Sequence, residues 1–159
     1  DGKVIGIDTA QAGSAQGIGF AIPIDLAKPI IEQVKAGEDI ARPWIGIYYQ
    51  PLDAQVAQDN DLTVTDGAWI HVSSEGQPEG EGQTQVPDAI VADSPAATAG
   101  LEAEDIITAI DGQAIDHEHP LDLVLLTHAP GDTVSLTVLR DGASQTIEVT
   151  LGTRPAETQ

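Results

Sequence analysis

The sequence predicts an α+β fold rich in short strands, and three observations support this prediction. The 16 glycines and 10 prolines among 159 residues indicate many turns. Short runs of alternating apolar and polar residues, such as 68–72, are typical of strands. Leu26, Ile30 and Val34 recur every four residues, which predicts an amphipathic helix over residues 25–36.

The composition excludes several classes of partner and chemistry. With 26 acidic and six basic residues the formal net charge is −20, so nucleic acid and anionic membrane are not expected partners. We interpret the acidity as a solvated, self-repelling surface. No run reaches the roughly 18 apolar residues of a membrane span, and no basic-then-apolar signal peptide opens the chain. The absence of Cys excludes disulfides and suits an extracytoplasmic location.

The N-terminal segment is predicted to form two strands and a helix. The strands cover residues 3–8 and 17–22, and Pro23 ends the second. Asp25 is the expected N-cap of the helix, which Gly37 ends. This segment has too little apolar surface to fold alone.

The middle of the chain is predicted to alternate strands with loops. Strands are expected over 45–50, 68–72 and 88–92, with a helical turn capped by Asp53 after the first. The segment 73–87 is rich in Gly, Glu, Gln and Pro, so we expect a flexible surface insertion there.

Turn and cap signals delimit the remaining elements. These are a short helix from Pro95 with Ser94 as N-cap and Gly100 at its end, strands over 105–110 and 113–115, a helix at Pro120 with His119 as N-cap, and strands over 134–140 and 146–151. Asp141-Gly142 is a strong hairpin signal between the last two strands. We expect the residues after 151 to fray.

The candidate binding motif is Arg42-Pro43-Trp44-Ile45-Gly46-Ile47. Pro43 favours an extended approach, and Gly46 allows a close backbone turn. Successive N–H groups from Ile45 to Ile47 can hold an anion such as a peptide carboxylate, which Arg42 would attract. An ordinary strand start is the alternative interpretation.

An apolar pocket beside this motif would hold the last side chain of the bound peptide. Its expected lining is Ile45, Ile47, Leu121, Val124 and Leu125, with Trp44 at the rim. The spacing of the helical residues does not decide which of their rows faces the groove.

Two clusters of metal-ligand residue types were weighed and set aside, so we expect no metal and no cofactor. In His117-Glu118-His119 the adjacent side chains would diverge, which favours helix capping. Asp59-Asn60-Asp61 lacks the central Gly and the terminal Glu of a calcium loop. Asp105 and Asp111 are interpreted as strand-edge and turn residues.

Two parts of the sequence resemble the HtrA/DegP family of trypsin-like serine proteases. DGKVIGIDTA (1–10) with GIGFAIPIDLA (17–27) resembles the last two strands of the protease domain, and SPAATAGLEAEDIITAIDGQAI (94–115) resembles the PDZ core. The resemblance implies a protease-domain remnant over 1–37, a PDZ domain over 38–152 and a tail over 153–159. The PDZ domain would be a strand-rich partial barrel with two helices.

The resemblance also implies a function and a location. It implies a PDZ module that binds hydrophobic C-termini or unfolded-protein segments, recruiting substrate or regulating proteolysis in the periplasm or cell envelope of a bacterium. The acidic chain should prefer neutral or basic tails.

Two other functional classes are open alternatives. An active serine endopeptidase is disfavoured for this chain, because GNSGGP and GxSxG motifs and a catalytic triad are absent, although the parent resembles an HtrA-type endopeptidase. An oligomerisation module would pair strands 3–8 and 17–22 with another copy, giving a homo-oligomer.

Overall fold

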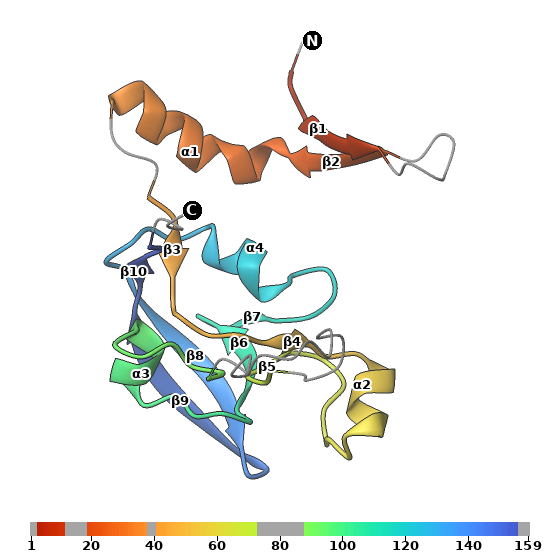
Figure 1. Ribbon diagram of the computed structural model, residues 1–159. Coiled ribbons are helices and arrows are strands. Elements are labelled where there is room, and N and C mark those ends of the chain that lie inside the picture. The colour runs from red at the N-terminus through yellow and green to blue at the C-terminus, as the bar shows by residue number, and fades with distance from the viewer. Residues whose placement is uncertain (1–2, 12–18, 38–40, 73–87, 156–159) are drawn as a thin grey trace, which may run out of the picture. The chain divides into compact units, whose positions relative to one another are not determined.

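The structure is a computed structural model that describes residues 3–11, 19–37, 41–72 and 88–155 (Figure 1). Its contacts divide the chain into unit 1, Asp1–Ala41, and unit 2, Arg42–Gln159. The predicted flexible insertion over 73–87 lies outside the described residues. The mixture of many strands with a few short helices confirms the predicted α+β class.

Unit 1 contains the predicted hairpin and helix. Strand β1 (Gly6–Gln11) pairs antiparallel with β2 (Gly19–Pro23). Strand β1 begins three residues later than predicted, and residues 17 and 18 of the second predicted strand lie outside the described residues. Helix α1 (Ile24–Ala36) follows at once and ends, as predicted, at Gly37 with φ of 75°. The predicted N-cap was wrong, because Pro23 takes that place and Asp25 lies inside the first turn.

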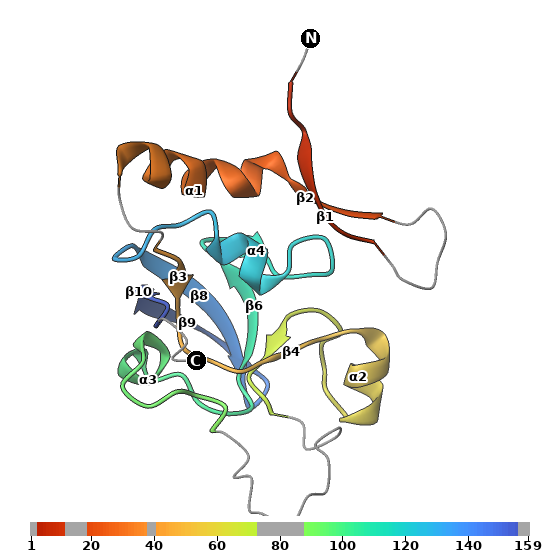
Figure 2. The same ribbon diagram turned by 45° about the horizontal axis from the view of Figure 1, so that its top comes forward.

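Unit 2 is built on one antiparallel sheet (Figures 1 and 2). Its strand order is β4 (Gln50–Pro51), β5 (Ala68–Trp69), β6 (Ile106–Ile110), β8 (Thr133–Arg140) and β9 (Ala143–Thr150), with β7 (Gln113–Ala114) also paired to β6. A second small sheet joins β3 (Pro43–Trp44) to β10 (Gly152–Thr153). The helices are α2 (Ala54–Asp59), α3 (Pro95–Ala99) and α4 (Leu121–Leu125).

The long hairpin of β8 and β9 confirms the Asp-Gly signal. Asp141 and Gly142 both have positive φ, 50° and 77°, as a two-residue hairpin turn requires. Pairing then extends beyond the expected fraying point. Leu151 is buried, and Gly152 and Thr153 pair with β3.

Local cap signals were read correctly at two of the three short helices. The Asp53 side chain accepts the N–H groups of Gln55 and Val56, each at 2.8 Å, at the start of α2. Ser94 Oγ accepts the Ala97 N–H at the start of α3. At α4 the predicted His119 cap was wrong, because Pro120 is the N-cap and its carbonyl accepts the first helical N–H groups.

Two predicted strands, 45–50 and 88–92, are mostly irregular. Between them the structure contains one isolated bridge, from Ile47 to Ile90. In the first segment the reason is Gly46, whose φ of 83° interrupts an extended chain. The predicted strand 68–72 is likewise reduced to β5.

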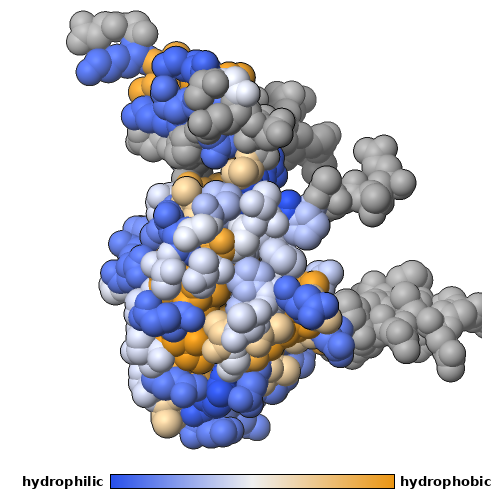
Figure 3. All heavy atoms as spheres, turned by 90° about the vertical axis from the view of Figure 1, so that its left-hand side faces the viewer, coloured by the Kyte–Doolittle hydropathy of each residue, from blue (hydrophilic) through white to orange (hydrophobic). Residues whose placement is uncertain are grey.

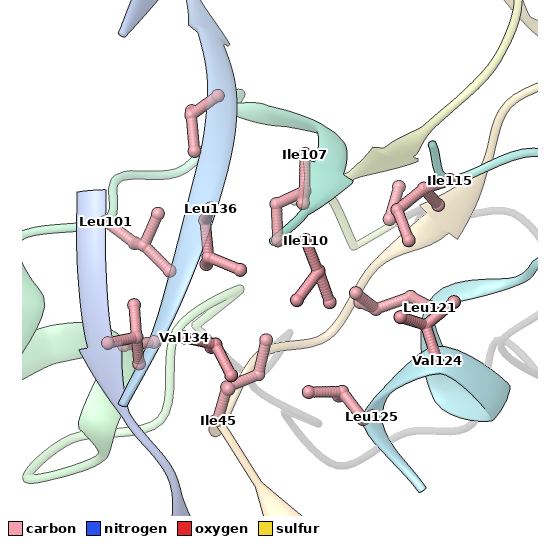
Figure 4. Packing of buried hydrophobic residues seen from close by; sticks show 14 of the residues in the cluster. Ile45, Leu101, Ile107, Ile110, Ile115, Leu121, Val124, Leu125, Val134 and Leu136 are labelled. Carbon is pink, nitrogen blue, oxygen red and sulfur yellow. The ribbon is translucent and has the colours of Figure 1, made fainter. Parts of the chain in front are cut away.

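The core of unit 2 is aliphatic, as expected from a chain with 3% aromatic residues. Figure 4 shows side chains of β6, β8 and α4 meeting around Ile45. Each such buried side chain contributes about 1.5–3 kcal/mol relative to exposure. A smaller cluster of Leu52, Trp69 and Ile106 packs with Val56 of α2. The main cluster fixes α4 relative to the segment that carries Ile45.

Candidate functional site

A groove of about 620 Å³ in unit 2 brings together most of the predicted site residues. One wall is the chain over residues 42–49, and α4 contributes Leu121, Asp122 and Leu125 to the lining. Figure 4 shows Leu125 of α4 and Ile45 packed in the core, and both residues also line the groove.

The predicted carboxylate-binding residues all line the groove, as do two of the predicted pocket residues on α4. These lining residues are Arg42, Trp44, Ile45, Gly46, Ile47, Leu121 and Leu125. The third, Val124, packs in the main core cluster and is 8% exposed. Leu121 and Leu125 belong to the same core cluster, so these two leucines of α4 both line the groove and pack in the core. The sequence alone did not distinguish them from Val124.

The predicted anion loop lines the groove, and one isolated bridge joins it to the segment at 89–91. Val91 donates its N–H to the Gly46 carbonyl at 2.9 Å, and Tyr48 donates to the Ala89 carbonyl at 2.7 Å. In an antiparallel bridge with this pattern, the N–H and C=O of the central residue, Ile47, point away from the segment at 89–91. Within the described residues, no hydrogen bond occupies the N–H groups of Ile45, Gly46 or Ile47.

The conformation of this loop depends on Gly46. A Cβ at that position would lie 2.3 Å from Ser94 Cβ and 2.8 Å from Ser94 Oγ. Ser94 is fully buried at the start of α3, and the nearby Ala96 N–H donates to the Ile45 carbonyl at 2.8 Å. The loop is therefore held against the N-terminal turn of α3, while positive φ lets successive N–H groups turn toward one region.

Positive charge is concentrated at the groove. From residue 42 onward the sequence has three basic residues, Arg42, Arg140 and Arg154, against 20 acidic ones. Arg140 holds buried Asp105 with two 2.7 Å hydrogen bonds, and these are the main reason that the pKa of Arg140 is raised. The other two arginines both line the groove. The interpretation of Asp105 as a strand-edge residue missed its pairing with Arg140.

Aromatic side chains are also concentrated there. Three of the chain's five aromatic residues, Trp44, Tyr48 and Tyr49, line the groove. Tyr49 Oη donates to Asp122 Oδ1 at 2.5 Å, so a hydrogen bond links the two walls. Burial, and then this hydrogen bond, raise the pKa of Tyr49. The sequence analysis did not predict the contact between Tyr49 and Asp122, because 73 positions separate these residues. The aromatic residues at 44–49 were the only sequence feature that pointed to Tyr49 as part of the site.

The two clusters weighed as metal sites make hydrogen bonds within the chain. Gln55 Nε2 donates to the Asp59 carboxylate, and Asn60 Nδ2 donates to the Val56 carbonyl. Asp116 Oδ1 accepts the N–H of His119, bonds the His119 ring and accepts the N–H of Glu118. These contacts, the His119 N–H first, lower the pKa of Asp116. Across the described ranges, no three His, Asp or Glu side chains are grouped as metal ligands. No helix in those ranges has the length and apolar character to cross a membrane.

Comparison with known proteins identifies relatives over nearly the whole chain. The family model described as PDZ domain matches residues 43–151. A probable periplasmic serine endoprotease, DegP-like, from Halomonas elongata is 32% identical over 98% of this chain and 30% of its own length. The protein of the same description from Brucella suis is 33% identical over 97% of this chain and 27% of its own length. The chain thus spans about 30% of the length of these relatives.

Solved structures of similar fold include two of one protease with bound peptides. The HtrA-type protease AlgW with decapeptide is 28% identical, with a TM-score of 0.68 over 98% of this chain and 43% of its own. AlgW with tripeptide is 30% identical, with a TM-score of 0.63 over 98% of this chain and 47% of its own.

Proposed function

Because the chain belongs to the PDZ domain family, we propose that unit 2 is the peptide-binding module of an HtrA-like serine protease. It binds hydrophobic C-termini or unfolded-protein segments, and thereby recruits substrate or regulates proteolysis. The observation that supports this proposal most directly is the set of three N–H groups, Ile45 to Ile47, beside an apolar groove.

Binding would proceed by strand addition. The ligand's last residues pair antiparallel with residues 47–49, where the N–H and C=O of Ile47 point away from the bridge to Ile90. The terminal carboxylate accepts the N–H groups of Ile45 to Ile47. The last side chain then enters the space between Ile45 and the leucines of α4, with Trp44 at its edge.

Charge supports the same orientation of the ligand. Arg42 is exposed and lies beside the donors, in a chain that is otherwise strongly acidic. A carboxylate is therefore attracted at this end of the groove, whereas acidic residues elsewhere in a ligand meet a repulsive surface. Neutral or basic hydrophobic tails are the expected ligands.

The catalytic part of this function belongs to the parent protein in our proposal. The relatives are named as serine endoproteases, and the sequence of this chain has no GNSGGP or GxSxG motif. The chain itself would then supply no catalytic residue. Because the relatives are named periplasmic, we place the parent in the periplasm.

The test is a titration of this chain with a fluorescent peptide that ends in Val and its C-terminally amidated twin. We expect the free acid to bind at least about tenfold more tightly, because loss of the carboxylate leaves several donors unpaired. Arg42→Gln should weaken binding of the free acid about two- to fivefold and leave the amide unchanged. Lys35→Gln, the same charge change on α1, is the matched control. Equal affinity of the two peptides would contradict the proposal.

A second role, in assembly, is favoured by the surface of unit 1. Ile5 is 86% and Val4 64% exposed, and Ile7 and Ile22 are also exposed. Figure 3 shows hydrophobic surface on this unit. We propose that it pairs with another copy, as uncovered strands and apolar side chains do. Light scattering before and after deletion of residues 1–36 tests this, and a monomeric mass in both cases would contradict it.

A further inference from the structure

We infer that the groove selects ligands that carry a basic side chain two residues before their C-terminal residue, and that Asp122 is the residue that selects them. The inference rests on the proposed peptide-binding function. It starts from the distribution of charge along the groove. The cation of Arg42 lies at the beginning of the 42–49 wall, and the Tyr49–Asp122 hydrogen bond, with its carboxylate, lies at the end of that wall.

Strand geometry places the ligand residue in question. If the carboxylate takes the N–H groups of Ile45 to Ile47, the terminal residue lies opposite Ile47. In an antiparallel pair the residue opposite Tyr49 is then two positions earlier, and opposed side chains share one face. The Tyr49 side chain is directed to Asp122 on α4. The side chain of that ligand residue therefore lies beside the Tyr49–Asp122 pair.

Asp122 is suited to receive a cation at this position. One of its oxygens, Oδ1, accepts the Tyr49 hydroxyl, and a carboxylate has further lone pairs on both oxygens. Tyr49 is a neutral donor, so it orients the carboxylate without neutralising it. None of the ion pairs among the described side chains includes Asp122. A Lys or Arg of the ligand would supply the missing counter-charge.

The expected effect is moderate because Asp122 is exposed to solvent. A surface ion pair changes a binding constant by about two- to fivefold. A Lys at the selected ligand position should therefore bind about two- to fivefold more tightly than Gln, and Glu more weakly than Gln. The preference should decrease as salt is raised, because exposed charges are screened.

The experiment titrates this chain with three free-acid peptides that end in Val and carry Lys, Gln or Glu two residues before it. Asp122→Asn keeps the size and the acceptor for Tyr49 but removes the charge. Glu148→Gln makes the same charge change at an exposed position of β9 that does not line the groove. We expect the Lys-over-Gln ratio to approach one in Asp122→Asn and to persist in Glu148→Gln.

Each outcome separates this inference from the proposed function. An unchanged Lys-over-Gln ratio in Asp122→Asn, or an equal loss in both variants, would overturn the role of Asp122. If the free acid binds better than the amide but the unsubstituted chain shows no Lys preference, the inference fails alone. If free acid and amide bind equally, the proposed function fails. The salt series on the unsubstituted chain needs no variant, and a Lys preference that is unaffected by salt would also refute the ion pair.

Discussion

Replacement of Gly46 by Ala tests whether the loop conformation is what creates the site. The substitution adds one methyl group at φ of 83°. An L-residue in this left-handed region costs about 1–2 kcal/mol. The added Cβ would also lie 2.3 Å from Ser94 Cβ and 3.0 Å from Trp44 Cζ2, and such overpacking costs about 1–3 kcal/mol. We therefore expect unit 2 to lose about 2–5 kcal/mol of unfolding free energy.

Gly100→Ala is the matched control for the backbone term. Gly100 has nearly the same φ, 80°, but a Cβ there would meet nothing within 4 Å. Gly100→Ala should therefore lower the unfolding free energy only by the cost of the left-handed backbone, about 1–2 kcal/mol. Ser94→Gly removes both crowded Ser94 atoms and, as a cap change, costs a few tenths of a kcal/mol. When Ser94→Gly is combined with Gly46→Ala, it should restore the part of the unfolding free energy that Gly46→Ala loses through crowding against Ser94.

Urea unfolding followed by tryptophan fluorescence measures these changes, because both tryptophans, Trp44 and Trp69, lie in unit 2. Peptide titration of the same variants measures the site. The reasoning is refuted if Gly46→Ala destabilises unit 2 no more than Gly100→Ala, within about 0.5 kcal/mol. It is also refuted if Ser94→Gly gives no recovery.

Two further predictions concern the charged and titrating groups of unit 2. Arg140→Ala leaves the buried carboxylate of Asp105 unpaired, so the unfolding free energy should fall by about 3 kcal/mol; this is the low end for a broken buried pair, because the Arg140 side chain is 25% exposed. Adding Asp105→Asn should recover part of the loss in urea unfolding, and no recovery would contradict a charge effect. The raised pKa of Tyr49 means that its stabilising contribution is complete below the ordinary tyrosine pKa of about 10 and is lost as pH rises above it. Urea midpoints should therefore fall more steeply above pH 10 in the unsubstituted chain than in Tyr49→Phe. Equal slopes would contradict a pKa of Tyr49 raised by burial and by the Asp122 hydrogen bond.

The elements that the sequence predicted well are those fixed by neighbouring residues. Ser94 and Pro95 favour the start of a helix through their own cap and backbone preferences. Asp141 and Gly142 favour a hairpin turn because both residues tolerate positive φ. The contacts that were missed join distant residues. Arg140 and Asp105 are 35 positions apart, and neither carries a local signal of the pairing.

The loop around Gly46 shows a different limit. Its composition resembles a strand, and a strand over 45–50 was predicted. Gly46 can adopt either sign of φ, so the residue itself does not decide between a strand and a loop. The decision comes from a tertiary contact, because the buried Ser94 lies too close to Gly46 for any side chain there. The strand prediction was therefore wrong around Gly46, and the assignment of Ile45 to Ile47 as carboxylate donors stays a prediction.

That difference matters for function. A regular strand over 45–50 would direct alternate N–H groups to opposite sides, and some of them would be taken by the segment at 89–91. In the observed loop, the segment at 89–91 uses the Gly46 carbonyl and the Tyr48 N–H, and α3 uses the Ile45 carbonyl. These contacts fix the loop from both sides while leaving the N–H groups of Ile45 to Ile47 unused within the described residues. If the proposed function is right, a loop that is held in this way before the ligand arrives needs little ordering on binding, which favours affinity for a short peptide end.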